Sequence, residues 1–280
     1  MEESSLYSAP VQKPKARDLL KQSYGILKSD KELVLFPIYS AVFSILGFIV
    51  VGGLYAAIRW GLMHGHQNRG VDYAFLFLLY IVSYYIVIYF NAGLAACVLY
   101  RFKGGDPTFA YGRGEAAKHR KAILGYALLA ATVGLILNYI AERFRLAGRI
   151  VANILGAVWS VATIFIAPVL VTSDLPPLQA VKESAGIFKS TWGNTVKGSL
   201  SFGLIGILGI IVCIVPAILG IAVGGAVPAF IGVIISALAL IALSVILSTC
   251  SSIYRTALFH YATTKQVPAG FTPGLAAAVR

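Results

Sequence analysis

The side chains best suited to metal chemistry are two neighbouring histidines. His64 and His66 flank a single glycine, and the only other candidate ligand close to them in the sequence is Asp72. Structural and catalytic zinc sites need three or four protein ligands, so this pair alone is insufficient. The sequence therefore predicts a solvated loop here and no metal site.

Thiol, nucleotide and hydrolytic chemistry are equally unsupported. All three cysteines lie inside apolar runs, at Cys97, Cys213 and Cys250. Reactive thiolates need polar, electropositive surroundings, so these thiols are expected to be buried or to face lipid. The Gly112-Arg113-Gly114 segment is no phosphate loop, because no strand precedes it and no GK[ST] follows. Since no nucleophile-and-base motif occurs either, we expect no catalytic residue, no cofactor and no enzyme.

A few polar residues and prolines interrupt the apolar runs and are candidates for lining a cavity. Asn91 follows Tyr84 and Tyr85, and Pro168 can bend the run that contains it. A buried asparagine more commonly bonds a neighbouring helix, for about 1 kcal/mol or less, and proline is common in membrane helices. No charged residue lies within an apolar run, which argues against ion-coupled transport.

The composition indicates that the apolar runs of the chain lie in a membrane. Apolar residues make up 58% of the chain and charged residues 12%, whereas a soluble domain carries about 25% charge. So few charges cannot cover the apolar side chains, and the surplus must face lipid. The net charge of +12 comes from basic residues between the apolar runs, where membrane proteins keep them, so we expect no nucleic-acid partner.

Six charge-free stretches are long enough to span a bilayer, which takes about 20 helical residues. They are expected near residues 35–58, 73–100, 122–141, 150–173, 198–221 and 227–253. Only helices satisfy their own backbone groups in lipid, so an all-α membrane fold is predicted. Eighteen Lys and Arg residues fall on one side of this arrangement and five on the other, which predicts cytoplasmic termini and a multi-pass protein of the inner (plasma) membrane.

A repeated segment indicates the internal organisation. KQSYGILKS at 21–29 and KESAGIFKS at 182–190 agree at six of nine positions, and each precedes a hydrophobic hairpin. In the first copy Leu20, Tyr24 and Leu27 have helical spacing, which predicts an amphipathic helix lying on the cytoplasmic interface. The middle copy before the third span is diverged and interrupted by Gly112 and Gly114.

The predicted architecture is therefore three hairpins, each preceded by an interfacial helix. The units are expected at 16–101, 106–173 and 177–262 within a membrane domain spanning 16–265. Residues 1–15 are predicted to be a disordered segment and 266–280 a C-terminal tail. Basic side chains near an anionic leaflet attract phospholipid head groups by about 1 kcal/mol each, although the same residues would also orient the chain. The candidate lipid contacts are Lys21, Lys28, Lys118, Arg120, Lys182 and Lys189.

Several segments also carry a resemblance. The chain resembles a bacterial domain-of-unknown-function family of six-span membrane proteins, from about Tyr89 onward, in GAVWSVATIFIAPVL at 156–170, YRTALFHYA at 254–262, and residues 132–137, 180–184, 189–193 and 267–271. More loosely, it is similar to the membrane domain of some glycerophosphodiester phosphodiesterases. The resemblance implies a bacterial inner-membrane protein and supplies no activity.

Two functions are compatible with these features. The first is a non-catalytic envelope scaffold, lipid sensor or partner-binding subunit, with the bilayer, anionic head groups and a protein of unknown identity as partners. The alternative is a channel or facilitator for a small neutral or amphipathic solute, which depends on Asn91, the preceding tyrosines and the proline-bent spans.

Overall fold

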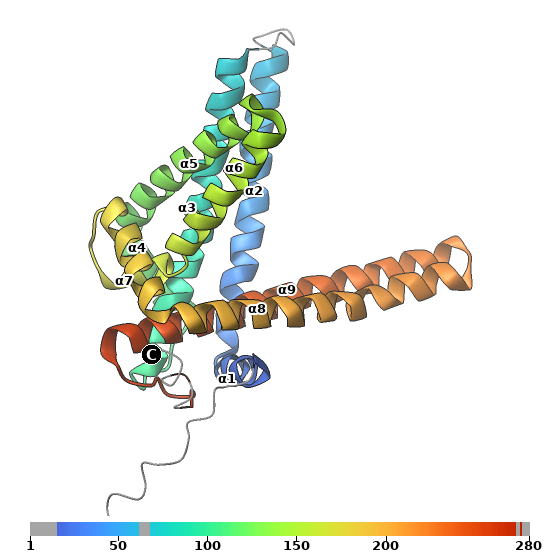
Figure 1. Ribbon diagram of the computed structural model, residues 1–280. Coiled ribbons are helices and arrows are strands. Elements are labelled where there is room, and N and C mark those ends of the chain that lie inside the picture. Colours follow the sequence, from blue (N-terminus) through green and yellow to red (C-terminus); the bar gives the residue numbers. More distant parts are fainter. Residues whose placement is uncertain (1–15, 62–67, 273–274, 276–280) are drawn as a thin grey trace, which may run out of the picture. The chain divides into compact units, whose positions relative to one another are not determined.

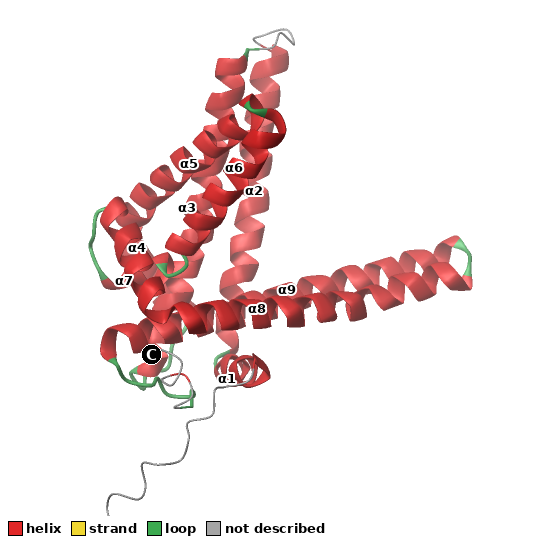
Figure 2. Cartoon of the chain, in the orientation of Figure 1, coloured by secondary structure: helices red, strands yellow, loops and turns green. Residues whose placement is uncertain are grey.

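The described part of the chain is built from helices. The structure is a computed structural model that describes residues 16–61, 68–272 and 275, and no strand occurs within them (Figures 1 and 2). In chain order the helices are α1 (Ala16–Ser29), the 3-10 helix η1 (Lys31–Val34), α2 (Leu35–Gly61), α3 (Arg69–Phe102), α4 (Phe109–Lys118), α5 (Arg120–Arg143), α6 (Arg145–Ala162), α7 (Ile166–Thr172), α8 (Pro177–Val223) and α9 (Ala226–Thr264). The all-helical fold is confirmed.

Five helical segments in the described residues are long and apolar enough to cross a membrane. They are η1 with α2, then α3, α5, the later part of α8, and α9. Their apolar side chains are largely exposed: Phe48 is 63% and Leu204 64% accessible. Exposure of this kind is strongly unfavourable in water, so these faces require lipid. The chain is a multi-pass membrane protein.

The expected fourth span, 150–173, is two helices. α6 and α7 are separated by a short break and bent by 40°. Pro168 explains the break, because it has no N–H for the carbonyl of Ile164 and its ring clashes with the preceding turn. The buried Oγ of Ser184 accepts the N–H of Phe165 at 3.1 Å and so satisfies one group in the break. Six spans result only if this bent pair counts as one.

The helices form two compact units, each described by itself. The central unit is Glu32–Lys189, and the terminal unit is Met1–Lys31 with Ser190–Arg280. In the central unit α3 packs against α2, α4, α5 and α7. Small side chains let helices approach closely in lipid, and they fill this core. Those with no exposed area include Ala92, Ala95, Cys97, Ala116, Ala127, Ala130, Ala131 and Ala180.

A glycine brings α4 against α3. A Cβ on Gly112 would lie 2.5 Å from the Sγ of Cys97 and 2.5 Å from the carbonyl oxygen of Gly93. Gly112 and Gly114 were expected to interrupt an interfacial helix, but α4 runs through both. Gly112 is needed because no larger residue permits this helix crossing.

The terminal unit contains the later part of α8, which forms a hairpin with α9, and α1, which packs on α9. Near the hairpin tip, a Cβ built on Gly220 would lie 3.2 Å from the Cα of Gly232, so the two backbones are almost in contact. Further along, a Cβ on Gly209 would meet the side chain of Leu243 at 2.7 Å. Glycines therefore set the spacing of this hairpin, as small residues do between membrane helices.

One face of α1 is buried against protein. Leu19, Ser23 and Leu27 are buried, whereas Tyr24 is 49% exposed and Leu20 is half-buried. The face of α1 that carries Leu19 and Ser23 therefore packs on protein, because α1 contacts α9. Leu20, Tyr24 and Leu27 were expected to face lipid; Leu27 is buried instead, and the placement of Leu20 and Tyr24 at the interface stays a prediction.

Two further expectations concern the ends of the repeats. α8 is one helix of 47 residues, so the segment 182–190 is its beginning and not a separate interfacial helix. In the predicted tail 266–280, Phe271 and Leu275 are buried, and Gln22 of α1 donates to the hydroxyl of Thr272 at 3.2 Å. This part of the tail therefore packs within the terminal unit. The segment 1–15, predicted to be disordered, lies outside the described residues.

Candidate functional site

Two kinds of hollow open on the central unit, one beside the middle of α3 and one at its N-terminal end. The first is called the aromatic groove. It has a volume of about 460 Å³ and is lined by Tyr39, Phe43, Tyr85, Ile86, Tyr89, Phe90, Phe109, Arg113, Ala117 and Arg120. The other lies at its N-terminal end and is called the polar pocket. It has a volume of about 740 Å³ and is lined by Arg69, Asp72, Tyr73, Leu76, Tyr139, Glu142 and Arg143.

Most rings of the aromatic groove belong to residues spaced one helical turn apart on α2 and α3. Tyr39 and Phe43 stand four residues apart on α2, and Tyr85 and Tyr89 four apart on α3, so each pair lies on one helix face. The Tyr85 and Tyr89 rings stack at 5.9 Å between centroids. Phe109 of α4 stacks on Tyr39 at 4.9 Å, and this contact brings the third helix to the groove.

The position of α4 is held by polar contacts as well as by Gly112. The carboxylate of Glu32 accepts the backbone N–H of Phe109 at 2.5 Å, at the start of the helix, where a negative charge is favourable. The Tyr89 hydroxyl donates to the carbonyl of Arg113 at 3.1 Å. These bonds place the Arg113 end of the groove against α3.

A smaller hollow continues the aromatic groove along α3 and α5. It has a volume of about 360 Å³, shares Tyr85, Ile86 and Arg120 with the groove, and adds Lys121 as a second basic residue. Its remaining walls are the apolar residues Ile81, Val82 and Leu124. The combined surface is thus an aromatic and aliphatic channel with basic residues along one side.

The charges around the groove have one sign. No carboxylate lines it, and among the described residues no acidic oxygen lies within 4 Å of the Arg113 or Arg120 guanidinium. Lys118, between them, is different: its Nζ lies 2.6 Å from Glu115, and this hydrogen bond raises the pKa of Lys118. Burial, and secondly Glu115, raises the pKa of the Tyr111 phenol on the same helix. The groove therefore presents two guanidiniums whose charge the neighbouring protein does not neutralise.

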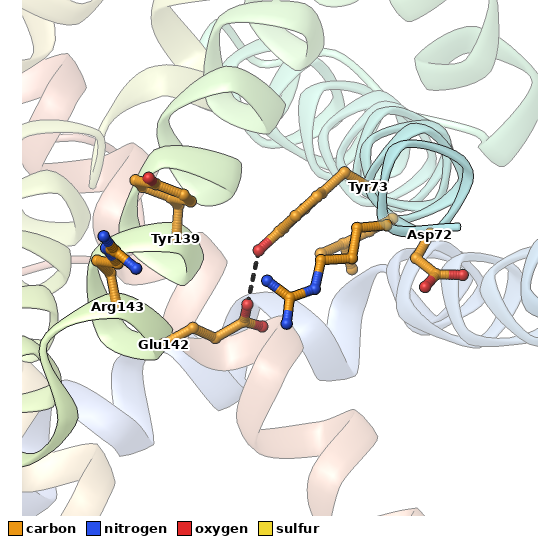
Figure 3. Close-up of a pocket in the computed structure, with 7 residues that line it drawn as sticks. Asp72, Tyr73, Tyr139, Glu142 and Arg143 are labelled. Atoms are coloured by element: carbon orange, nitrogen blue, oxygen red, sulfur yellow. Dashed lines mark hydrogen bonds between the residues drawn. The ribbon is translucent and has the colours of Figure 1, made fainter. Parts of the chain in front are cut away.

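The polar pocket joins the first turn of α3 to the last turn of α5. Figure 3 shows Tyr73 pointing at Glu142, whose Oε2 accepts its hydroxyl at 2.7 Å. The amide of Asn138 donates to the Oε1 of Glu142 at 2.9 Å. Asp72 accepts from Tyr55 at 2.8 Å and pairs with Arg59 at 3.1 Å.

The expected cavity residues are not gathered at one place. Tyr85 lines the aromatic groove, whereas Tyr84 faces Gly134 of α5, whose built Cβ would lie 3.6 Å from its hydroxyl. Asn91 donates to the carbonyl of Val87 on its own helix at 2.8 Å, and Pro168 is buried in α7. Neither lines any of the three hollows. Spacing along the sequence could not show which of these four residues lie at the same hollow.

The expected lipid-contacting residues are also divided. Arg120 lines the groove, and Lys118 is beside it but paired. Lys21 and Lys28 are exposed on α1, and Lys182 and Lys189 on α8. Arg113 was missed, although its position between two glycines at the start of a basic segment was a usable signal.

Metal and thiol expectations can be compared only with the described residues. Within them no group of three His, Cys, Asp or Glu side chains could hold a metal ion, and His64 and His66 lie outside them. Cys97 and Cys250 are buried, as expected from their apolar surroundings, and Cys213 is half-buried.

A family model covers most of this architecture. It describes a family of unknown function (DUF6159) and matches residues 70–270, from the start of α3 to the C-terminal segment. The chain belongs to this family. The match includes the whole polar pocket except Arg69, and the aromatic groove except Tyr39 and Phe43 of α2. No curated protein and no solved structure shows significant similarity to the chain.

Proposed function

We propose that this DUF6159 protein is a non-catalytic lipid-sensing subunit of the membrane, and that it binds an anionic phospholipid in the aromatic groove. The observation that carries the proposal is that Arg113 and Arg120 line the same groove as a wall of aromatic rings. Neither arginine has a carboxylate partner among the described residues. A phosphate matches the planar guanidinium fork, and the rings suit the boundary between head group and acyl chain.

The length and composition of the groove suit a lipid better than a soluble anion. The phosphate would lie at the two arginines, with Lys121 beside it. An acyl chain would follow Ile81, Val82 and Leu124 into the hydrocarbon, where these residues already need apolar neighbours. A soluble anion would leave this apolar side of the groove without a partner.

The orientation supports the same ligand. The groove adjoins the connection 101–121, which is rich in Lys and Arg, so the positive-inside rule predicts that this end faces the cytoplasm. That leaflet carries the anionic lipids in the plasma membrane. We therefore infer an inner-membrane location with both termini cytoplasmic and the groove at the depth of the inner head groups.

Binding without chemistry is the best-supported activity. The described groove walls hold tyrosine, phenylalanine, aliphatic and arginine side chains, and no carboxylate, imidazole or thiol among them could act as a general base. The alternative of a channel or facilitator has less support, because Asn91 bonds to its own helix and the residues after it, including Ala92 and Ala95, are buried.

The internal repeat forms part of the proposal. Ser23 and Ser184 occupy matching places in the two copies, and both are fully buried. Leu27 and Phe188 also match, with exposed fractions of 4% and 8%. Each expected preamble also lies against the second helix of a hairpin: α1 on α9, α4 on α3, and Ser184 of α8 on the α6–α7 break. This common contact supports three related units, whose boundaries remain a prediction.

The decisive experiment compares lipid retention by native mass spectrometry of the full chain, titrated with phosphatidylglycerol or phosphatidylcholine in a neutral detergent. The double variant Arg113→Gln/Arg120→Gln should lose about tenfold or more of its phosphatidylglycerol affinity, because each charge near a phosphate contributes about 1 kcal/mol. Lys118→Gln is the matched control: it removes one charge from the same helix but does not line the groove. Equal retention by wild type and the double variant would refute the proposal.

A further inference from the structure

The polar pocket is larger than the aromatic groove, and lipid binding at the groove does not involve it. Its walls come from α3 and α5, which pack together in the central unit. Polar side chains of both helices line it, among them Tyr73, Tyr139 and Arg143, and the close-up shows Tyr73 of α3 directed at Glu142 of α5 (Figure 3). What the pocket can bind depends on which of its charges already have partners.

Its carboxylates are occupied by the protein. Both oxygens of Glu142 accept hydrogen bonds, one from the Tyr73 hydroxyl at 2.7 Å and one from the Asn138 amide at 2.9 Å. Asp72 accepts from the Tyr55 hydroxyl at 2.8 Å and pairs with Arg59 at 3.1 Å. Neither carboxylate is therefore a strong attractor for a cationic ligand.

The two arginines that line the pocket, in contrast, have no acidic partner among the described residues. Arg69 and Arg143 both line the pocket, and no acidic oxygen among the described residues lies within 4 Å of either guanidinium. Each guanidinium has five N–H donors in a fixed planar arrangement. With Arg59, which pairs with Asp72, the described residues of this cluster include three arginines and two carboxylates, so one positive charge is left over among them. A ligand with a single negative charge would neutralise it.

We propose that the polar pocket is a separate binding site for a phosphate-ester monoanion. Phosphate oxygens are matched bidentately by guanidinium forks, so Arg69 and Arg143 bind the phosphate. Leu76 and the Tyr139 ring, 53% exposed, supply an apolar wall for the esterified carbon groups. Tyr73 and Asn138 are positioning residues, because they hold Glu142 away from the arginines that the ligand needs.

The ligand chemistry has two sources that one experiment can separate. A phospholipid head group and a soluble glycerophosphodiester both carry the same singly charged phosphate. The full chain in neutral detergent is titrated with soluble glycerophosphoglycerol, and in parallel it is reconstituted in nanodiscs of phosphatidylcholine containing phosphatidylglycerol. Binding of the soluble probe identifies a soluble ligand. Loss of one retained phosphatidylglycerol per chain in the pocket variants, with the lipid at the aromatic groove kept and no binding of the soluble probe, identifies the head group.

The arginine variants decide whether the pocket is a site at all. Arg69→Gln/Arg143→Gln should weaken binding of the responding probe about tenfold or more, since each lost contact is a hydrogen bond to a charged group. Arg143→Lys, which keeps the charge, should lose less and guards against a folding defect. Arg149→Gln is the matched control, because Arg149 is an exposed arginine of α6 that does not line the pocket.

A positioning role for Tyr73 makes a second, independent test. Tyr73→Phe keeps the ring but removes the donor to Glu142, which then competes with the ligand for the arginines, so affinity should fall about threefold to tenfold. The inference is overturned if neither probe binds, or if Arg149→Gln weakens binding as much as Arg69→Gln/Arg143→Gln. Since Arg113 and Arg120 are untouched throughout, failure here leaves the aromatic groove unaffected.

Discussion

The aromatic groove and the polar pocket lie along the same helix, and both carry surplus positive charge, yet their walls are opposite in character. The groove has arginines against rings and aliphatic side chains, with no carboxylate. The pocket has arginines among carboxylates that are already hydrogen-bonded or ion-paired. Under the two proposals, the positive charge favours an anion at both sites, and the walls distinguish a lipid with an acyl chain from a compact phosphate ester.

The length of α3 explains how one helix can carry both sites. Its 34 residues extend about 51 Å at 1.5 Å per residue. The hydrocarbon core is only about 30 Å thick, so both ends of a spanning α3 reach the head-group regions. Charged side chains are tolerated there, and this explains why Arg69 and Arg101 stand in the first and last turns of an otherwise apolar helix.

The largest predicted effect comes from closing the α3–α4 crossing. In Gly112→Ala the new Cβ would meet Cys97 and the Gly93 carbonyl at 2.5 Å, so α4 must shift. Overpacking of this kind costs about 1–3 kcal/mol, and the displaced helix carries Phe109 and Arg113 out of the groove. Thermal unfolding in detergent should show a lower Tm, and phosphatidylglycerol retention should be lost while binding at the polar pocket persists.

Gly114→Ala is the control for that variant. Nothing lies within 4 Å of a Cβ at Gly114, and alanine is the better helix former, so Tm should stay the same or rise slightly. An equal loss of Tm in both variants would contradict the close-approach role of Gly112.

The next largest effect tests whether the helix packing around the α6–α7 break can be weakened without changing ligand binding at the groove or the pocket. Ser184→Ala removes the acceptor of the Phe165 N–H at the α6–α7 break, and a buried donor left without a partner costs about 1–3 kcal/mol. Tm should fall while binding at the groove and the pocket is retained. Ser160→Ala, whose hydroxyl bonds an exposed helix carbonyl at Gly156, should leave Tm nearly unchanged. Loss of either ligand in Ser184→Ala alone would mean that the break belongs to a site.

Independence of the two sites is the third test. Tyr73 and Tyr89 are separated by about 24 Å along α3, and changes at this distance usually add within about 0.3–0.5 kcal/mol. Combining Arg113→Gln/Arg120→Gln with Arg69→Gln/Arg143→Gln should therefore give the product of the two separate losses in affinity. A ligand at one site that changes affinity at the other by several-fold would show that they are coupled.

The smallest effect is expected at Lys118. Its pKa is raised by the hydrogen bond to Glu115, so its stabilising contribution is present at neutral pH and below and is lost as the pH rises through the raised pKa, above the ordinary 10.5. Because the pair is exposed, Lys118→Gln should lower Tm only marginally and leave phosphatidylglycerol retention unchanged. A large loss of retention would place Lys118 among the groove residues after all.

The sequence alone determined that the chain is helical and membrane-spanning, because apolar runs of this length without charges have no other stable solution in lipid. It also indicated the break near Pro168, since proline removes a helix hydrogen bond wherever it stands. The basic character of 101–121 was likewise evident, and with it the candidate Arg120.

Only the tertiary structure decided which of the many apolar and aromatic residues form a site. In a lipid-embedded helix every face is apolar, so the periodicity that marks a buried face in a soluble protein is absent. Tyr84 and Tyr85 are therefore indistinguishable in sequence, although only Tyr85 lines the groove. In sequence Gly112 is typical of a helix interruption, whereas in the structure it lets α4 pack against α3, and that contact brings Arg113 to the groove. Helix formation is a local property, whereas a site depends on which helices pack together.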